Sequence, residues 1–205
     1  AREELEHKAN KTYGMHGEDM RAFRVILDHL RASTVLIGEG VLPSNKDQGY
    51  FVRRLIRRAV RFGKKVGIQG DWVACVGAAF IDEYREAYPG LEVMRETILT
   101  ELEREEEKFR KTLTKGEKEF ERLFTHKGRI SGEDAFVLYS TYGFPIELTE
   151  EIAVERGQVI DRAVFQEEFR KHQDLSRSGS EQKFAGGLAD TSEATVKLHT
   201  ATHML

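Results

Sequence analysis

The chain has 205 residues, of which 40% are hydrophobic and 33% are charged, and its net charge is −3. This composition is typical of a soluble, helix-rich protein with one or two domains. It excludes a membrane-spanning helix, because no run of eighteen apolar residues occurs, and its single cysteine, Cys75, excludes an internal disulfide. We expect a cytoplasmic protein in which Cys75 is buried.

The first part of the chain is predicted to form helices separated by glycine and proline. The first helix covers residues 21–37, and the Pro43-Ser44-Asn45 segment then forms a loop. Asp47, or else Ser44 or Asn45, is expected to cap the helix that follows. The remaining helices of this part are predicted over residues 48–65, 71–87 and 91–124, the last with Gly116 as a weak point.

The second part is predicted to contain shorter helices. They start at Ser131, at Thr149 as a cap after Pro145, and at Asp161 as a cap. The Gly/Ser-rich composition after them predicts a linker. We expect a mainly α, bundle-like fold with little or no sheet, divided into a helical subdomain (1–125), a second helical subdomain (126–175), a linker (176–190) and the start of another domain (191–205).

The helix over residues 48–65 carries the most distinctive charge pattern. Between Tyr50 and Lys65 it has no acid and a charge of +7, so the rest of the chain sums to −10 (−3 − 7). Apolar and basic pairs alternate every four residues, which gives one apolar and one cationic face. The apolar face should pack on helix 21–37, and the cationic face should stay in solvent. Its basic residues are Arg53, Arg54, Arg57, Arg58, Arg61, Lys64 and Lys65.

A cationic helix in an acidic chain indicates a polyanionic partner, and nucleic acid is the first candidate. One alternative is that the arginines are matched by the many glutamates of residues 92–121. A membrane surface is disfavoured, because large aromatic anchors are missing from this helix. A third possibility is a structural module whose basic helix docks on an acidic partner domain.

Three ordered segments of the chain stand out. The first combines RVILDHLRA (24–32), Pro43-Ser44-Asn45 and GYFVRRLIRRAVR (49–61), the second is LYSTYGFPIELTE (138–150), and the third is LHTATH (198–203). Together they resemble the alanyl-tRNA synthetase family, whose members carry LYDTYGFPxDLTxE at the second segment. The resemblance implies the helical middle region of an alanine–tRNA ligase. Such an enzyme joins alanine to transfer RNA with ATP and magnesium, through catalytic and editing domains elsewhere in the same chain.

The resemblance also implies RNA-binding residues. In the family this region recognises a G·U wobble pair in the acceptor stem, which Asn45 and Glu147 would approach from its two grooves, with Lys46, Tyr50 and the basic residues of 53–65 supplying further contacts. An amide and a carboxylate suit base edges, whereas arginines suit phosphates. Two positions depart from the family pattern: Glu147 replaces the usual Asp, and Gln48 replaces a common Arg.

His199 and His203 stand four residues apart, as two zinc ligands on a helix would. The resemblance implies that they are half of a zinc site in the editing domain, whose other ligands lie beyond Leu205. We therefore expect no metal site and no catalytic residue within these 205 residues, although metal-dependent hydrolysis of mischarged RNA through this pair is an alternative. The Asp28-His29 pair is interpreted as structural, because adjacent helical residues point in different directions.

Overall fold

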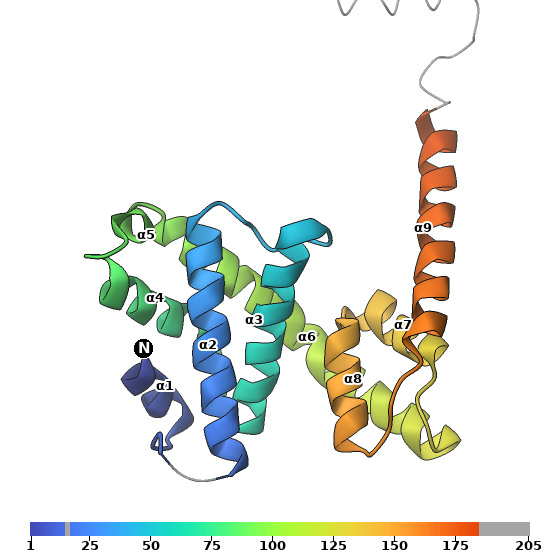
Figure 1. The fold of residues 1–205 in the computed structure, drawn as a ribbon, viewed down its shortest axis with the longest axis horizontal. Coiled ribbons are helices and arrows are strands. Elements are labelled where there is room, and N and C mark those ends of the chain that lie inside the picture. The colour runs from blue at the N-terminus through green and yellow to red at the C-terminus, as the bar shows by residue number, and fades with distance from the viewer. Residues whose placement is uncertain (15–16, 185–205) are drawn as a thin grey trace, which may run out of the picture.

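A computed structural model describes residues 1–14 and 17–184 of the chain (Figure 1). The described residues form helices and no strand, which confirms the prediction of a mainly α fold. The helices are α1 (Arg2–Ala9), α2 (Glu18–Gly38), α3 (Asp47–Lys65), α4 (Val73–Tyr84), α5 (Pro89–Val93), α6 (Arg95–Lys127), α7 (Gly132–Tyr142), α8 (Ile146–Glu155) and α9 (Arg162–Phe184). Within this part of the chain, no helix combines the length and apolar character that a membrane crossing requires.

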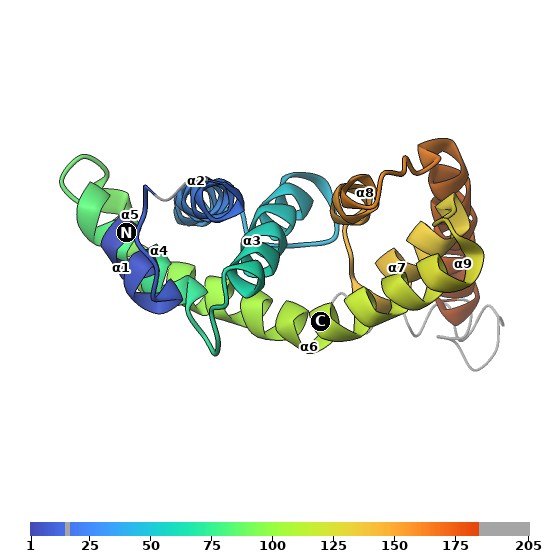
Figure 2. The same ribbon diagram turned by 90° about the horizontal axis from the view of Figure 1, so that it is seen from below.

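The long helix α6 supports the other helices along its length. Figure 2 shows α2, α3 and α8 on one side of α6, with α1, α4 and α5 toward its start and α7 and α9 toward its end. The residues of α6 that face these helices are mainly apolar and buried, among them Ile98, Leu102, Phe109 and Phe120, and they also include the buried Glu105 and Glu106. One buried apolar face on a single helix of 33 residues therefore joins the two halves of the molecule.

The basic helix packs on α2 as predicted. The contact between α2 and α3 is the most extensive between any two described helices. It buries Ile26 and Leu30 of α2 and Val52 and Ile56 of α3 completely. Burial of a side chain of this size is worth roughly 1.5–3 kcal/mol, so this contact anchors α3 firmly.

Some predicted boundaries are wrong. The helix expected over 91–124 is two helices, because Met94 leaves helical geometry (ψ 7°) between α5 and α6. Thr149 is not a cap: α8 already begins at Ile146 after Pro145, and Thr149 lies buried inside it. Cys75 is exposed, not buried.

The linker predicted from residue 176 does not start there, because α9 continues to Phe184. This extension contains one glycine, Gly179, which lowers helix stability by about 1 kcal/mol relative to alanine. That cost does not end α9, because the helix is already nucleated by its packing on α7. The boundary that we expected between the two helical subdomains, after residue 125, falls within the last turn of α6. Residues 185–205, including His199 and His203, lie outside the described part of the chain.

Other predicted helix signals are confirmed. Ser131 caps α7 and forms a capping box with Asp134. Asp161 Oδ1 accepts a hydrogen bond of 2.9 Å from the backbone N–H of Ala163 at the start of α9. Gly116 lies in α6 where the ring of Phe144 packs against the helix, and a side chain at Gly116 would collide with that ring. Helix α6 continues through Gly116, so the predicted weak point does not interrupt it, and the glycine instead allows close contact with Phe144.

Candidate nucleic-acid interface

The loop before α3 presents Asn45 and Lys46 on the surface. Ser44 Oγ accepts a hydrogen bond from Lys46 N (3.2 Å) and donates one to Lys46 O (2.9 Å), which closes a tight turn around Asn45. The chain comes back so closely that a side chain at Gly49 would collide with Ser44 and Leu42. The predicted cap is wrong: α3 starts at Asp47 without a side-chain hydrogen bond to its first turn from any described residue.

Asn45 and Glu147 line the same groove, although they are far apart in the sequence. The groove has a volume of about 650 Å³ and lies between the loop before α3 and the starts of α8 and α9. Its lining residues are Asn45, Lys46, Asp47, Tyr50, Tyr139, Ile146, Glu147, Arg162, Phe165, Gln166, Phe169 and Gln173. The two residues singled out by the sequence are thus brought to one site.

Both of these side chains are held in place by neighbours. Glu147 accepts hydrogen bonds from Arg54 (2.9 Å), Arg162 (3.3 Å) and the Tyr50 hydroxyl (3.3 Å). Asn45 Oδ1 accepts a hydrogen bond from Arg53, and the amide N–H groups of Asn45 have no partner among the described residues. Burial and the Glu147 carboxylate raise the pKa of Tyr50, so its hydroxyl remains a donor.

The cationic face of α3 is not free in solvent, which corrects the sequence prediction. Arg57 and Arg61 are only 8% and 3% exposed. Arg57 Nε donates to Glu105 of α6 at 2.6 Å, and Arg53 pairs with the same carboxylate at 3.4 Å. Arg57 also donates to the carbonyl of Gly143. These guanidinium groups connect α3 to α6 and to the Gly143 turn.

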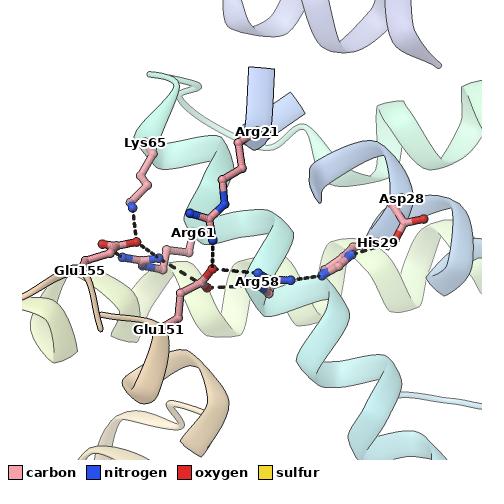
Figure 3. Close-up of polar contacts among 8 residues, drawn as sticks. All are labelled: Arg21, Asp28, His29, Arg58, Arg61, Lys65, Glu151 and Glu155. Atoms are coloured by element: carbon pink, nitrogen blue, oxygen red, sulfur yellow. Dashed lines mark hydrogen bonds and ion pairs between the residues drawn. The ribbon is translucent and has the colours of Figure 1, made fainter. Parts of the chain in front are cut away.

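The counter-charges come mainly from α8. Glu147, Glu151 and Glu155 recur every four residues and face Arg54, Arg58, Arg61 and Lys65 of α3, and we call this set the charge ladder. Its middle is shown in Figure 3, where Arg58 binds Glu151 with two hydrogen bonds (2.8 and 3.1 Å). Arg61 does the same with Glu155 (2.7 and 3.2 Å).

The charge ladder explains how same-sign arginines share one helix face. Helices α3 and α8 are not among the described helix pairs in extensive close contact, so long side chains span the space between them. Acids of residues 92–121 contribute only in part, through Glu105 to Arg53 and Arg57, and through Glu117 to Lys64. The spacing of Glu147, Glu151 and Glu155 was the sequence signal that the prediction missed.

The Asp28-His29 pair extends this network. Arg58 Nη1 lies 2.9 Å from His29 Nε2, and His29 Nδ1 lies 3.3 Å from Asp28 (Figure 3). Burial and the nearby Arg58 lower the pKa of His29, so the ring is neutral at pH 7 and accepts from Arg58 through Nε2. This geometry agrees with the structural interpretation of the pair.

The described residues contain no cluster of three or more His, Cys, Asp or Glu side chains suited to a metal ion. Their polar groups are arranged for binding by hydrogen bonds and charge. Sequence reasoning missed the residues that α9 contributes to the groove, namely Arg162, Phe165, Gln166, Phe169 and Gln173. Their spacing of three, four and seven residues marks one helix face, but nothing in it indicated which partner that face meets.

Comparison with known proteins identifies the family. The family model described as tRNA synthetases class II (A) matches residues 2–205. An alanine–tRNA ligase of Borrelia hermsii is 45% identical over 207 residues, covering 99% of this chain and 35% of the relative. One from Treponema denticola is 48% identical (98% and 35% covered), and one from Pelotomaculum thermopropionicum is 41% identical (83% and 20% covered).

The chain thus spans about 35% of the length of the most similar of these relatives, and the similarity extends over nearly all of its own residues. A family model that matches from residue 2 to residue 205 includes both the loop that carries Asn45 and the helix that carries Glu147. From this match and these identities we conclude that the chain belongs to the class II (A) tRNA synthetase family.

Proposed function

We propose that this chain is the region of an alanine–tRNA ligase that recognises the acceptor stem of alanine tRNA through a G·U wobble pair. One observation carries the proposal: Asn45 and Glu147 line one groove, and each is held in place by arginines. The complete enzyme would act in the cytoplasm and use ATP and magnesium for aminoacylation. Its catalytic and editing domains, the second with zinc, would be partners of this region in the same chain.

The chemistry of the groove suits base edges better than phosphates. With its oxygen bound to Arg53, Asn45 offers N–H donors, which suit the acceptor atoms of a minor-groove edge. The Glu147 carboxylate can accept from a base amino group, while Arg54 and Arg162 offset its charge next to the RNA backbone. This pair would supply discrimination between stems.

The basic residues divide into two groups in this proposal. Arg57 and Arg61 are buried and hold the fold, so we assign them no direct RNA contact. Arg54 and Arg58 retain about a third of their side-chain exposure, 31% and 33%, and lie beside the groove or close to it. They and the exposed Lys46 would contact phosphates, with smaller contributions from Lys64 and Lys65.

Gel-shift titration of the chain with a G·U acceptor stem and its G·C variant tests this function. We expect tighter binding of the G·U stem, and Asn45→Ala should reduce the difference. Arg54→Ala should weaken binding of both stems by a similar factor and lower the salt dependence. Arg85→Ala is the control, because Arg85 is exposed after α4 and makes no ion pair with any described residue. Equal affinity for the two stems would refute specific recognition by this chain.

A second candidate function is favoured by the charge ladder. Because most basic groups of α3 are already paired with glutamates, α3 could serve only to hold α8 and α6 together, as a structural module. In that case Arg54→Ala would lower stability and leave RNA binding no weaker than Arg85→Ala does. The same titrations, combined with urea unfolding of each variant, separate the two functions.

A further inference from the structure

Helix α9 forms one wall of the groove, opposite the loop that carries Asn45. Gln166 and Gln173 of α9 line the groove together with Asn45 and Lys46. An adjoining hollow of about 490 Å³ again contains Asn45, Lys46 and Gln173. Gln166 and Gln173 are seven residues apart, so they lie on one face of α9, about 10.5 Å apart along its axis.

These two glutamines are free to bind a ligand. Both are exposed, and within the described residues neither side-chain amide makes a hydrogen bond. Lys46 is exposed and likewise unpaired among the described residues. The arginines of α3 differ, because their partners are Glu105, Glu147, Glu151 and Glu155. The groove therefore contains polar side chains whose hydrogen-bonding groups have no partner among the described residues.

Aromatic contacts hold α9 against α7 beside the glutamines. Phe165 and Phe169 of α9 stack on each other with ring centroids 6.1 Å apart, and both meet the ring of Tyr139 of α7 edge-on, at 5.7 and 5.5 Å. Such contacts fix the rotation of α9 about its axis. The face of α9 that carries Gln166 and Gln173 is thus turned toward the groove.

We propose that Gln166 and Gln173 bind ribose 2′-hydroxyls and base edges of the acceptor stem in the groove that they share with Asn45. This inference rests on the proposed function. A glutamine amide both donates and accepts, which matches a 2′-hydroxyl and a base edge alike. The groove's charged lining residues, Lys46, Asp47, Glu147 and Arg162, sum to zero, so hydrogen bonds and shape, rather than net charge, would select the ligand.

The test compares RNA binding by the 205-residue chain, by the Gln166→Ala/Gln173→Ala double variant, and by Gln69→Ala. Gln69 is an exposed glutamine after α3 that does not line the groove, so it controls for loss of an amide. Fluorescence anisotropy would be measured with the G·U stem, the G·C stem, and a G·U stem carrying 2′-deoxy sugars. Circular dichroism would check that the double variant folds, as expected for residues without intramolecular partners.

We expect the double variant to bind both ribose stems about tenfold or more weakly, since each lost hydrogen bond is worth about fivefold. Its loss should be clearly smaller on the 2′-deoxy stem, because the contacts it removes are already missing there. A double variant that binds like Gln69→Ala would overturn this inference and leave the proposed function intact. If the unmodified chain bound no stem at all, both would fall.

Discussion

Two surfaces of α3, its flank toward α6 and α8 and its N-terminal end, differ in charge and in the number of polar side chains without a partner in the described part of the chain. The flank that faces α6 and α8 carries the basic side chains of α3, and its arginines are paired with glutamates. The N-terminal end of α3 has few charges, yet it borders the groove in which Lys46, Gln166 and Gln173 remain unpaired among the described residues. A dense basic stripe can therefore be a structural element, and under our proposal recognition depends on the groove residues that have no partner among the described residues.

The largest effect is expected from breaking the buried part of the flank. Glu105→Ala would leave Arg57 buried without its carboxylate, which costs about 3–5 kcal/mol of unfolding free energy. Urea unfolding measures this loss. Glu107→Ala is the control, because Glu107 is exposed and pairs only with the exposed Lys111 among the described residues. A loss as small as that of the control would show that the flank is not structural.

A pH effect distinguishes buried from exposed acids on α6. Burial raises the pKa of Glu106 to about 7, although Trp72 and Val73 donate backbone hydrogen bonds to it. The folded state therefore holds a proton that the unfolded state releases near pH 4.5, so stability should fall as pH rises from about 4.5 to 7.

Glu106→Gln keeps an acceptor for Val73 N–H and removes this titration. At pH 8 the variant should be more stable than the parent chain by up to about 3 kcal/mol, with the difference vanishing toward about pH 4.5. Thermal or urea unfolding at both pH values measures it. A constant difference between variant and parent across this range would contradict the assignment to Glu106.

A smaller effect is expected where the two halves meet. Gly116→Ala should cost about 1–2 kcal/mol, because overpacking against Phe144 outweighs the better helix propensity of alanine. Gly90→Ala is the matched control, since a side chain at Gly90 in α5 would meet no described atom within 4 Å. Unfolding midpoints compare the two variants, and a stabilising Gly116→Ala would disprove the tight contact.

The smallest effect is expected at Glu147. Glu147→Asp withdraws the carboxylate by about 1.5 Å and lengthens its bond to Arg54. The pair is partly exposed, so stability should change by less than about 1 kcal/mol. The ratio of G·U to G·C affinity should nevertheless change, if Glu147 reads the stem directly. An unchanged ratio would assign discrimination to other groove residues.

The sequence predicted those features that depend on one helix at a time. The apolar spacing of α2 and α3 located both helices and their contact, because that pattern repeats within a few residues. It could not predict the pairing of Arg58 with Glu151, since ion pairs between distant segments depend on how the helices are placed in space. The prediction that the cationic face stays in solvent considered only the repulsion between arginines within α3. The glutamates that pair with these arginines lie on α8.

The candidate site was predictable only in part for the same reason. Asn45 and Glu147 were found through resemblance to a family, whereas Gln166 and Gln173 belong to no recognised motif and gained meaning only when α9 was seen beside the groove. Boundaries failed where composition misled: Ser and Gly after residue 175 suggested a linker, but α9 continues through them to Phe184.

Helix α6 also sets the distance between the two walls of the groove. Asn45 belongs to the half that rests on the start of this helix, and α7 and α9 belong to the half that rests on its end (Figure 2). One residue inserted between Glu105 and Gly116 would turn one half by about 100° relative to the other. The register of α6 thus decides whether the Asn45 amide and the Glu147 carboxylate line the same groove.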